Sequence, residues 1–400
     1  MSDTSAESPR SVLVVEDRAH SQLGHMPVRF AELAAGFAGL GHHVEVLTSR
    51  GWYFEGRAVP FRVHRYGPIA RSLSRLCDFF LAASLPSKPR RWVHRGASVL
   101  RVVVMVGATR ARRARMGQDT VVVIVSLANF PALIAALAGR GRWLKYMFFL
   151  PSVPSTTFGQ RFVGLIHRVA ARAERVRRAR GGCCIIATSA DVPRVAWAAS
   201  VPGLEVVVMP VAGVSAARVV PDARQQLGLV GTDRVALLFG ATYSTKDSDV
   251  VFRAFAPDSG DAPAGWRLMA VGTVADAAPP SSCVLTRPGF VDDGVRALAY
   301  SAADLVVISF GSGFFSNSGT LMDAIAWGIP VVCSDQCAPA EVVREYRLGA
   351  IFEAGDAASL AAAVRSAPSH IDPDDLARAR AELSNRAVAQ RALDTLDVQG

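Results

Sequence analysis

The chain has 400 residues, a length that suits two domains of ordinary size better than one core. Half of the residues are apolar and a fifth are charged, a balance that excludes an intrinsically disordered chain. The formal net charge of +10 favours anionic ligands such as nucleotide diphosphates, membrane headgroups or nucleic acid, and does not choose among them.

The cysteines and the N-terminus indicate a reducing compartment. The six cysteines lack the paired spacing of a zinc site and are too few for a disulfide scaffold, so we expect reduced, mostly buried thiols. Residues 1–10 are polar, lack the apolar segment of a signal peptide and are expected to form a disordered leader. Arg101 interrupts the longest apolar stretch, 97–108, so no segment reaches the ~18 apolar residues that span a bilayer. We therefore expect a cytoplasmic protein.

In the N-terminal half, apolar runs typical of buried parallel strands alternate with amphipathic helices. Residues 11–16 form the first such run. A loop, a helix over 28–41 and a second strand over 43–48 follow, which completes one right-handed β-loop-α-β unit. We predict further strands over 120–126, 143–149, 183–189 and 205–209, and further helices over 131–138 and 161–180.

A second series of the same kind opens at residue 234. Its predicted strands cover 234–240, 266–272, a segment near 284, 304–309 and 329–334, and its predicted helices cover 321–327 and 373–397. Two separate series indicate the α/β class, with two doubly wound, Rossmann-like domains. We place the N-terminal domain at 11–209, the C-terminal domain at 210–375, and over 376–400 a C-terminal helix that packs back toward the N-terminal domain.

The loops that follow strands in the second series carry the candidate chemistry, because open α/β sheets bind ligands at the carboxyl ends of their strands. Gly240 closes a strand, which lets a ligand approach the backbone, and Lys246 follows within reach of a diphosphate. A loop rich in glycine and serine, 309–320, runs into the helix at 321, where the amides and the dipole favour phosphate oxygens.

Two acidic residues stand near predicted helix starts. The Asp323 carboxylate can accept two hydrogen bonds from the vicinal hydroxyls of a ribose. Glu341 stands at the start of the helix that follows the loop after residue 334. These features also have structural interpretations, namely strand-ending turns and acidic residues favoured by the helix dipole.

Four runs resemble, in order and spacing, the C-terminal domain of retaining GT-B glycosyltransferases, those of family 4 above all: FGATYSTK, PGFVDDGVRALAYSAADLVV, NSGTLMDAIAWGIPVVCSD and APAEVVREYRLGAIFEAGD. In the N-terminal half, Gly24 and His25 precede a helix with the spacing of that family's glycine loop. The resemblance implies a GT-B fold, in which two Rossmann-like domains face each other across a cleft.

The resemblance also implies roles for individual residues. Gly24, Gly240 and Lys246 match donor diphosphate contacts, and Lys246 and His25 are the catalytic candidates. Asp323 matches the second glutamate of the family's Glu-x7-Glu motif, which binds the nucleotide ribose. In the loop before it, Asn317, Ser318, Gly319 and Thr320 match the residues that hold the diphosphate, and Phe315, Ser316 and Asn317 are placed beside the sugar.

Three positions depart from the family pattern. Phe315 replaces the first glutamate of the motif and cannot hydrogen-bond a sugar hydroxyl. Ala241 replaces an arginine, and the N-terminal Gly-Gly pair is Gly24-His25. The lost charge-assisted contact is worth about 1.5–3 kcal/mol, so Lys246 and the Asn-Ser-Gly amides are expected to hold more of the diphosphate. The donor sugar stays open.

Other signals bear on metals and surfaces. Asp247-Ser-Asp249 imitates the metal-binding DxD of another glycosyltransferase fold, but its place at a helix start favours N-capping. Because the histidines also lack zinc-binding spacing, we expect no metal and no cofactor. The basic helix 161–180 is typical of either a solvated face or a contact with the inner face of a membrane. No nucleic-acid-binding motif is present, so no nucleic-acid partner is expected.

We therefore expect a glycosyltransferase that moves a sugar from a nucleotide diphosphate donor to a small-molecule, natural-product-like acceptor, with retention and without a metal. A lipid-linked or polysaccharide acceptor at the membrane surface stays open. A nucleotide-sugar epimerase and a non-catalytic nucleotide-sugar-binding protein of the same fold are further alternatives. The nucleotide base, the general base and the oligomeric state are not determined by the sequence.

Overall fold

The computed structural model divides the chain into two compact units. Unit 1 comprises residues 1–211 and 385–400, and unit 2 comprises residues 212–384. The structure describes residues 8–16, 26–49, 54, 56, 58–82, 87–125, 141–147, 183–188, 205–208, 213–229, 234–242, 246–257, 262–278, 284–289, 291–311 and 318–398.

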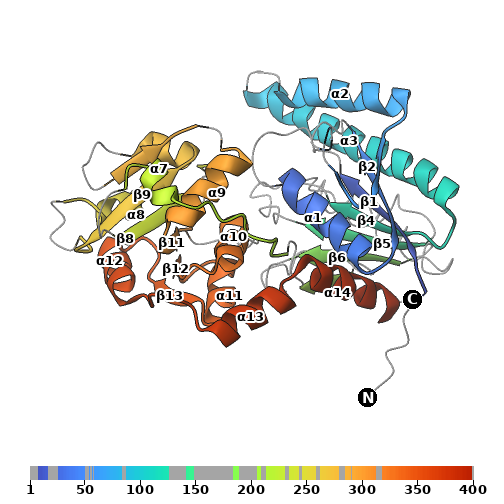
Figure 1. Cartoon of the computed structure of the whole chain (residues 1–400). Helices are drawn as coiled ribbons and strands as arrows, with labels where there is room; N and C mark the ends of the chain where they lie inside the picture. Colours follow the sequence, from blue (N-terminus) through green and yellow to red (C-terminus); the bar gives the residue numbers. More distant parts are fainter. Residues whose placement is uncertain are drawn as a thin grey trace, which may run out of the picture. The chain divides into compact units, whose positions relative to one another are not determined.

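The described part of unit 1 is built on one parallel sheet (Figure 1). Its strand order is β3-β2-β1-β4-β5-β6-β7, so the order reverses between β1 and β4. The strands are β1 (Ser11–Glu16), β2 (His43–Thr48), β3 (Arg62–Arg65), β4 (Val121–Val125), β5 (Arg142–Met147), β6 (Cys183–Thr188) and β7 (Glu205–Val208).

Helices cover both faces of this sheet because successive side chains of a strand point to opposite sides. Val12 and Val14 pack on the side of α1 (Met26–Gly39) and α14 (Asn385–Val398). Leu13 and Val15 pack on the other side, against α3 (Ser87–Met116), and α2 (Pro68–Ala82) packs on α3. Figure 1 shows α14, from the end of the chain, beside α1 near its start.

Unit 2 holds a second parallel sheet in the order β10-β9-β8-β11-β12-β13. Counted from the first strand of the unit, this is the order 3-2-1-4-5-6 of a dinucleotide-binding Rossmann fold. The strands are β8 (Arg234–Phe239), β9 (Trp266–Val271), β10 (Val284–Arg287), β11 (Leu305–Ile308), β12 (Val331–Ser334) and β13 (Gly349–Phe352).

The helices of unit 2 also lie on both faces of its sheet. One apolar cluster joins the sheet to α9 (Asp293–Ala302), α10 (Gly319–Trp327) and α11 (Ala338–Glu345). The opposite cluster joins it to α8 (Ser248–Ala254) and α12 (Ala357–Ser366). The remaining elements are α7 (Ala223–Gln226), the 3-10 helix η3 (Thr273–Ala277) and α13 (Pro373–Glu382).

The strands agree with the sequence patterns to within two residues at most ends, whereas the C-terminal helix differs. The expected single helix over 373–397 is two helices, and unit 2 ends at Ser384 rather than at residue 375. At the break, the Leu383 carbonyl accepts a hydrogen bond from the Val214 amide at 2.7 Å. Val214 and Ser384 form an isolated bridge, so the carbonyl at the end of α13 has its partner outside the helix.

Two of the expected helices, 131–138 and 161–180, lie outside the described residues, whereas the structure describes the side chains of three cysteines. Cys77, Cys333 and Cys337 are buried free thiols. In the described part of the chain, no helix is long and apolar enough to cross a bilayer.

Candidate functional site

The strand order of unit 2 creates a switch point between β8 and β11. Neighbouring strands connect to opposite sides there, so the loops at their carboxyl ends diverge and leave room for a ligand. Gly240 follows β8, and Phe310 and Gly311 follow β11. The sequence-predicted loops therefore end at the edge where a ligand of this fold binds.

Gly240 and Gly272 bring two backbones together at this edge. Their φ angles are +110° and +103°, values that residues with a Cβ atom rarely adopt. A Cβ on Gly272 would lie 2.4 Å from the Gly240 carbonyl oxygen. The Gly240 carbonyl also accepts a hydrogen bond from Val274 at 3.1 Å. The edge therefore presents backbone rather than side chains to a ligand.

Lys246 returns to the same edge from the loop after β8. Its Nζ donates to the Phe239 carbonyl at 2.5 Å, and a Cβ on Gly240 would lie 3.6 Å from it. Its backbone forms an antiparallel bridge with Phe310, which ties it to the end of β11. Burial lowers the pKa of Lys246 to about 8, because a charged ammonium loses water there.

The segment after Lys246 is fixed by hydrogen bonds to β11. The Asp247 amide donates to the Ser309 carbonyl at 3.1 Å, and the Ser309 hydroxyl donates to the Asp247 carbonyl at 2.7 Å. The Asp247 side chain accepts from the Val250 amide at 3.3 Å and caps α8. The N-capping interpretation of Asp247-Ser-Asp249 is confirmed.

The start of α10 supplies the second part of the site. Ser318 is the N-cap, and its hydroxyl accepts a hydrogen bond from the Leu321 amide at 3.3 Å. Gly319 and Thr320 form the first helical positions, and the first turn carries no acidic residue. Amides in a first turn have no carbonyl partner within their own helix, and the dipole adds positive potential. The arrangement suits an anion at the carboxyl end of β11.

Asp323 lies one turn further along α10 and is only 2% exposed. Its Oδ1 stands 3.4 Å from Nη1 of Arg296, which comes from α9. Arg296 also lies 3.6 Å from Asp293 and places its guanidinium over the Trp327 ring. Asp323 is thus a buried carboxylate whose orientation is set by Arg296. The sequence patterns do not single out Arg296 as part of the site.

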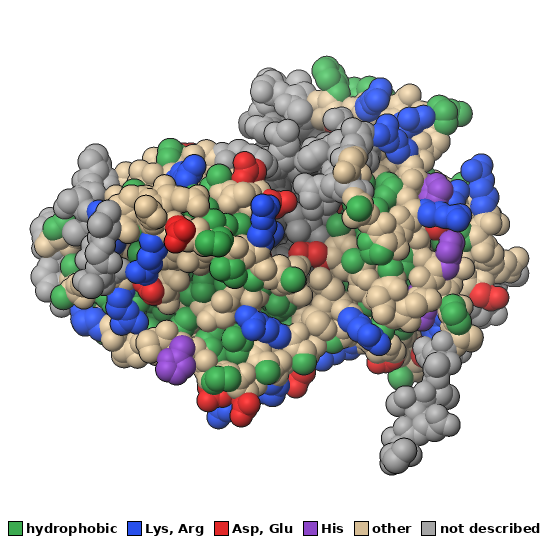
Figure 2. Space-filling view, in the orientation of Figure 1, with side chains coloured by type: hydrophobic (Ala, Val, Ile, Leu, Met, Phe, Trp, Pro, Cys, Tyr) green, Lys and Arg blue, Asp and Glu red, His purple; other side chains and the backbone are tan. Residues whose placement is uncertain are grey.

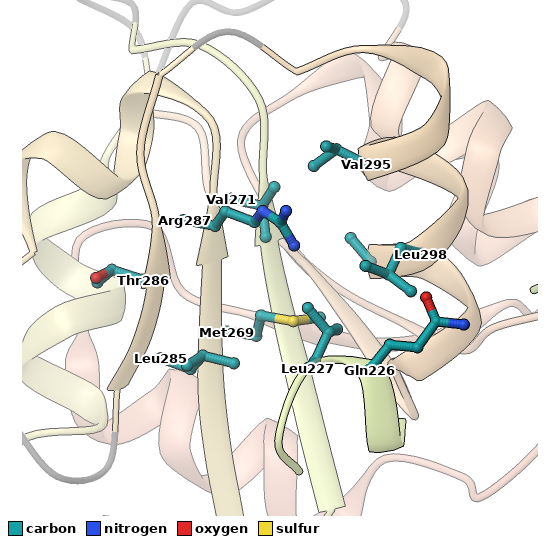
Figure 3. A pocket seen from close by; sticks show the side chains of 10 residues that line it. Gln226, Leu227, Met269, Val271, Leu285, Thr286, Arg287, Val295 and Leu298 are labelled. Carbon is teal, nitrogen blue, oxygen red and sulfur yellow. The ribbon is translucent and has the colours of Figure 1, made fainter. Parts of the chain in front are cut away.

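A cavity of about 270 Å³ lies in unit 2 between β9, β10 and the helices α7 and α9 (Figure 3). Met269, Val271 and Leu298 contribute apolar walls. In Figure 3 the Arg287 side chain extends from its strand toward the helix that carries Val295 and Leu298. Val271 and Arg287 are the last residues of their strands, so the cavity reaches the same edge as Gly240 and Lys246.

The loop after β12 supports this edge from the side. The Ser334 hydroxyl accepts from the Phe310 amide at 2.9 Å and donates to the Phe310 carbonyl at 2.8 Å. Cys337 precedes α11, and Glu341 lies in the first turn of that helix, as the sequence indicates. Ser334 therefore acts on the site through the backbone after β11.

Not every candidate can be placed. Gly24 and His25 lie outside the described residues, as do Phe315, Ser316 and Asn317. Ala241 is half-buried beside Gly240. All the other candidates lie on unit 2: Gly240 and Lys246 are neighbours after β8, and Ser318, Gly319, Thr320 and Asp323 lie at the start of α10. Among the residues that the structure describes, no group of three or more His, Cys, Asp or Glu could hold a metal ion.

The sequence of unit 2 matches a known protein family. Residues 233–369 match the family model described as Glycosyl transferases group 1. The matched segment begins just before β8 and ends after α12, and it contains Gly240, Lys246 and the whole of α10. Among curated proteins, none has a significantly similar sequence.

Solved glycosyltransferases share the fold of the whole chain. Sucrose-phosphate synthase of Thermosynechococcus elongatus aligns over 98% of this chain and 97% of its own, at 17% identity and a TM-score of 0.58. For a glycosyltransferase of Rickettsia africae, both coverages are 98%, the identity is 10% and the TM-score is 0.64. HepE of Anabaena, solved with UDP and glucose, aligns over 97% of this chain and 100% of its own, at 15% identity and a TM-score of 0.63. The shared fold is GT-B.

Proposed function

Because the chain is a glycosyltransferase of the GT-B fold with a group 1 glycosyltransferase domain over residues 233–369, we propose that it transfers a sugar from a nucleotide diphosphate-sugar to a small-molecule acceptor. The acceptor is natural-product-like, and transfer retains the anomeric configuration without a metal or cofactor. The observation that carries the proposal is the switch point of unit 2, where Gly240, Lys246 and the start of α10 share one edge.

The donor diphosphate occupies this edge. The Lys246 ammonium and the first-turn amides of α10 place positive charge where the leaving phosphate gains negative charge. These groups are held in place before the substrate binds, so no reorganisation is needed during the reaction. HepE, which has the same fold, binds UDP and UDP-glucose. The site of this chain would accept a ligand of the same class.

The nucleoside extends from the diphosphate along α9. The Asp323 carboxylate, oriented by Arg296, accepts hydrogen bonds from the ribose. The base enters the cavity beside Val295, where apolar walls stack on it and the guanidinium of Arg287 reads its edge. Arg296 follows Val295 directly in α9, so the two subsites are adjacent.

In the reaction, the bond between the anomeric carbon and the β-phosphate oxygen breaks as the bond to the acceptor oxygen forms on the same face. The leaving phosphate takes the acceptor proton. His25 remains a candidate second catalytic residue on the acceptor side. We expect the protein in the cytoplasm, and peripheral contact with a membrane is the alternative setting if the acceptor is lipid-linked.

Thermal-shift screening of the full chain with UDP, GDP and dTDP tests the donor site. One nucleotide should raise the melting temperature in a saturable way, and Lys246→Ala should remove most of that rise, because a charge-assisted contact is worth about 1.5–3 kcal/mol. Arg253→Ala is the matched control, since Arg253 is an exposed cation further along the same loop and helix. An unchanged shift in Lys246→Ala would refute the assignment.

Donor turnover separates the proposed transferase from its alternatives. The selected nucleotide is supplied as a panel of its sugar conjugates, with a library of small hydroxylated acceptors, and products are identified by mass spectrometry. Acceptor-dependent nucleotide release with an α-linked product from an α-linked donor supports the proposal. Donor isomerisation favours the epimerase, and binding without turnover favours a non-catalytic protein. Undiminished transfer in EDTA is expected.

A further inference from the structure

A second cavity, of about 300 Å³, lies in unit 1 and is lined by Ser49, Arg65, Arg71 and Arg75. It contains no residue of the site described above. Of the four lining residues that the structure describes, three are arginines and none is acidic. Neighbouring like charges repel one another, and a bound anion would offset this repulsion.

The fold brings these residues together from three elements. Ser49 directly follows β2, and Arg65 ends β3, where its register partner is Thr48. The ladder continues past the strands, since the Tyr66 amide donates to the Thr48 carbonyl at 3.0 Å. Arg71 and Arg75 lie one turn apart on α2, so they point to the same face of that helix.

The surroundings add positive potential. The first turn of α2 contains no acidic residue, so the positive end of its dipole is not offset there. Asp78 is the acidic residue of α2, and it is paired with Arg101 of α3 at 2.6 Å. Figure 2 shows Lys and Arg side chains gathered over α2. Ser49, which is 3% exposed, is the buried residue among those that line the cavity.

The position of the cavity relates it to substrate binding. It lies at the carboxyl ends of β2 and β3, and β1 ends at the same edge because Glu16 is in register with Thr48. Open α/β sheets bind their ligands at this edge. In a glycosyltransferase whose donor binds to the other unit, the corresponding edge of unit 1 is available to the acceptor.

We propose that Ser49, Arg65, Arg71 and Arg75 form a subsite for a phosphoryl group, and, on the basis of the proposed function, that this group belongs to the acceptor. A phosphate monoester carries a charge of about −1.5 to −2 and three acceptor oxygens, which match three guanidinium groups and a hydroxyl. A carboxylate carries one charge and two oxygens, so it can engage fewer of these groups than a phosphate monoester.

Titration of the full chain with inorganic phosphate, followed by calorimetry, tests the subsite. The Lys246→Ala background removes the main phosphate contact of the donor site, so the remaining binding reports unit 1. Arg71→Ala with Arg75→Ala should weaken this binding by about a hundredfold, roughly tenfold for each lost charge-assisted contact. Arg110→Ala is the matched control, because Arg110 is exposed on α3 of the same unit and does not line the cavity.

Two comparisons guard this test. The double lysine variant, Arg71→Lys with Arg75→Lys, keeps the charge and should bind phosphate with intermediate affinity even if the alanine variant unfolds. Acetate should bind at least tenfold more weakly than phosphate. Equal phosphate binding by the alanine pair and by Arg110→Ala would overturn the subsite, and acetate binding equal to phosphate would overturn its assignment to a phosphoryl group.

The source of the phosphoryl group is resolved with vesicles. Cosedimentation with phosphatidylcholine vesicles containing phosphatidic acid, lost in the alanine pair, would assign the group to a lipid headgroup. Phosphate binding without such cosedimentation would assign it to a soluble phosphate ester. The nucleotide-induced thermal shift of the alanine pair should equal that of the native protein. If no nucleotide binds to either protein, the proposed function fails while the phosphate subsite stands.

Discussion

At the scale of single residues, Lys246 is a cation kept where burial opposes its charge. Its Nζ donates to the Phe239 carbonyl, and burial lowers its pKa to about 8. In the unfolded chain the lysine pKa is near 10.4, so between pH 8 and about 10.4 the unfolded state binds more protons than the folded state. The free energy of unfolding therefore rises with pH over this range, as the cost of burying the charged ammonium is relieved. A diphosphate bound as we propose would act in the opposite direction, because it would stabilise the protonated ammonium.

We therefore expect the affinity for the selected nucleoside diphosphate to fall as the pH rises above 8. Below pH 8 the lysine is already protonated, and above it binding must take up a proton, which costs about tenfold per pH unit. Calorimetry from pH 7 to 10 measures this slope. Lys246→Arg keeps its charge throughout, so its affinity should be flat, and an equal slope in both proteins would contradict the prediction.

Asp323 allows a test that separates the ribose contact from folding. The native protein should prefer the ribonucleotide to its 2′-deoxy form by roughly ten- to a hundredfold, the value of a hydrogen bond to a charged group. Asp323→Asn keeps the shape beside Arg296 and should lose most of this preference. Competition binding measures the ratio, and the melting temperature reports folding. A native protein that does not distinguish the two nucleotides would show that Asp323 has another role.

The cavity beside α9 allows a test that separates the proposed base contact from the diphosphate contact. Leu298→Trp should fill it, because Leu298 is one of its apolar walls. We expect nucleotide affinity to fall at least tenfold while pyrophosphate affinity stays within twofold, since Lys246 and α10 are untouched. Leu376→Trp, a half-buried leucine of unit 2 outside the cavity, is the control for the added bulk. Equal losses for both ligands would place the base elsewhere.

At the scale of secondary structure, α1 and α14 pack so closely that a side chain is excluded between them. A Cβ on Gly36 would lie 2.2 Å from the Asn385 carbonyl oxygen, which belongs to backbone and cannot turn away. Gly39, in the same helix, has no atom within 4 Å of its Cβ position. The two glycines lie in the same helix and differ in their packing, so Gly39 serves as the control for Gly36.

Gly36→Ala should destabilise the protein by about 1–3 kcal/mol through overpacking, although alanine favours a helix. Gly39→Ala should be neutral or stabilise it by up to about 1 kcal/mol. Urea unfolding, followed by circular dichroism, measures the difference in the free energy of unfolding. Similar values for the two variants would mean that α14 can move away from α1.

At the scale of the whole molecule, the chain returns to unit 1 after Ser384, and its C-terminal helix α14 completes the core of that unit. Val388, Leu393 and Leu396 are at most 1% exposed and pack with α1 and the sheet. Asp397 also pairs with Arg10 at 2.8 Å and with Arg142 at 2.5 Å. Burial of three such side chains is worth roughly 5 kcal/mol or more, which is comparable with the stability of a domain.

A chain that ends at Ser384 should therefore lose the thermal transition of unit 1 and keep that of unit 2. Scanning calorimetry detects the two transitions, and the selected nucleotide should still raise the remaining one. A chain that ends at Val398 should behave like the full protein. Retention of both transitions in the shorter chain would show that unit 1 is stable without α14.

Elements whose sequence pattern lies within a few neighbouring residues are predicted from the sequence, whereas elements that depend on distant contacts are not. Buried parallel strands such as β4 are continuous apolar runs, so the sequence alone predicts them. The helices α2 and α3 were not predicted, because arginine interrupts their apolar pattern. Arg101 is 4% exposed and paired with Asp78 of the neighbouring helix, so only the packed hairpin explains its place.

The sequence by itself determined the α/β class, the two series and the segments that carry Gly240, Lys246 and Asp323, because these depend on neighbours along the chain. The tertiary structure decided the rest. Gly272 matters because it packs against Gly240, and Arg296 matters because α9 brings it to Asp323. The arginine cavity exists because strand pairing sets the end of β2 beside Arg65 and α2 contributes Arg71 and Arg75. Contacts between distant segments arise only when the chain folds, and no local pattern records them.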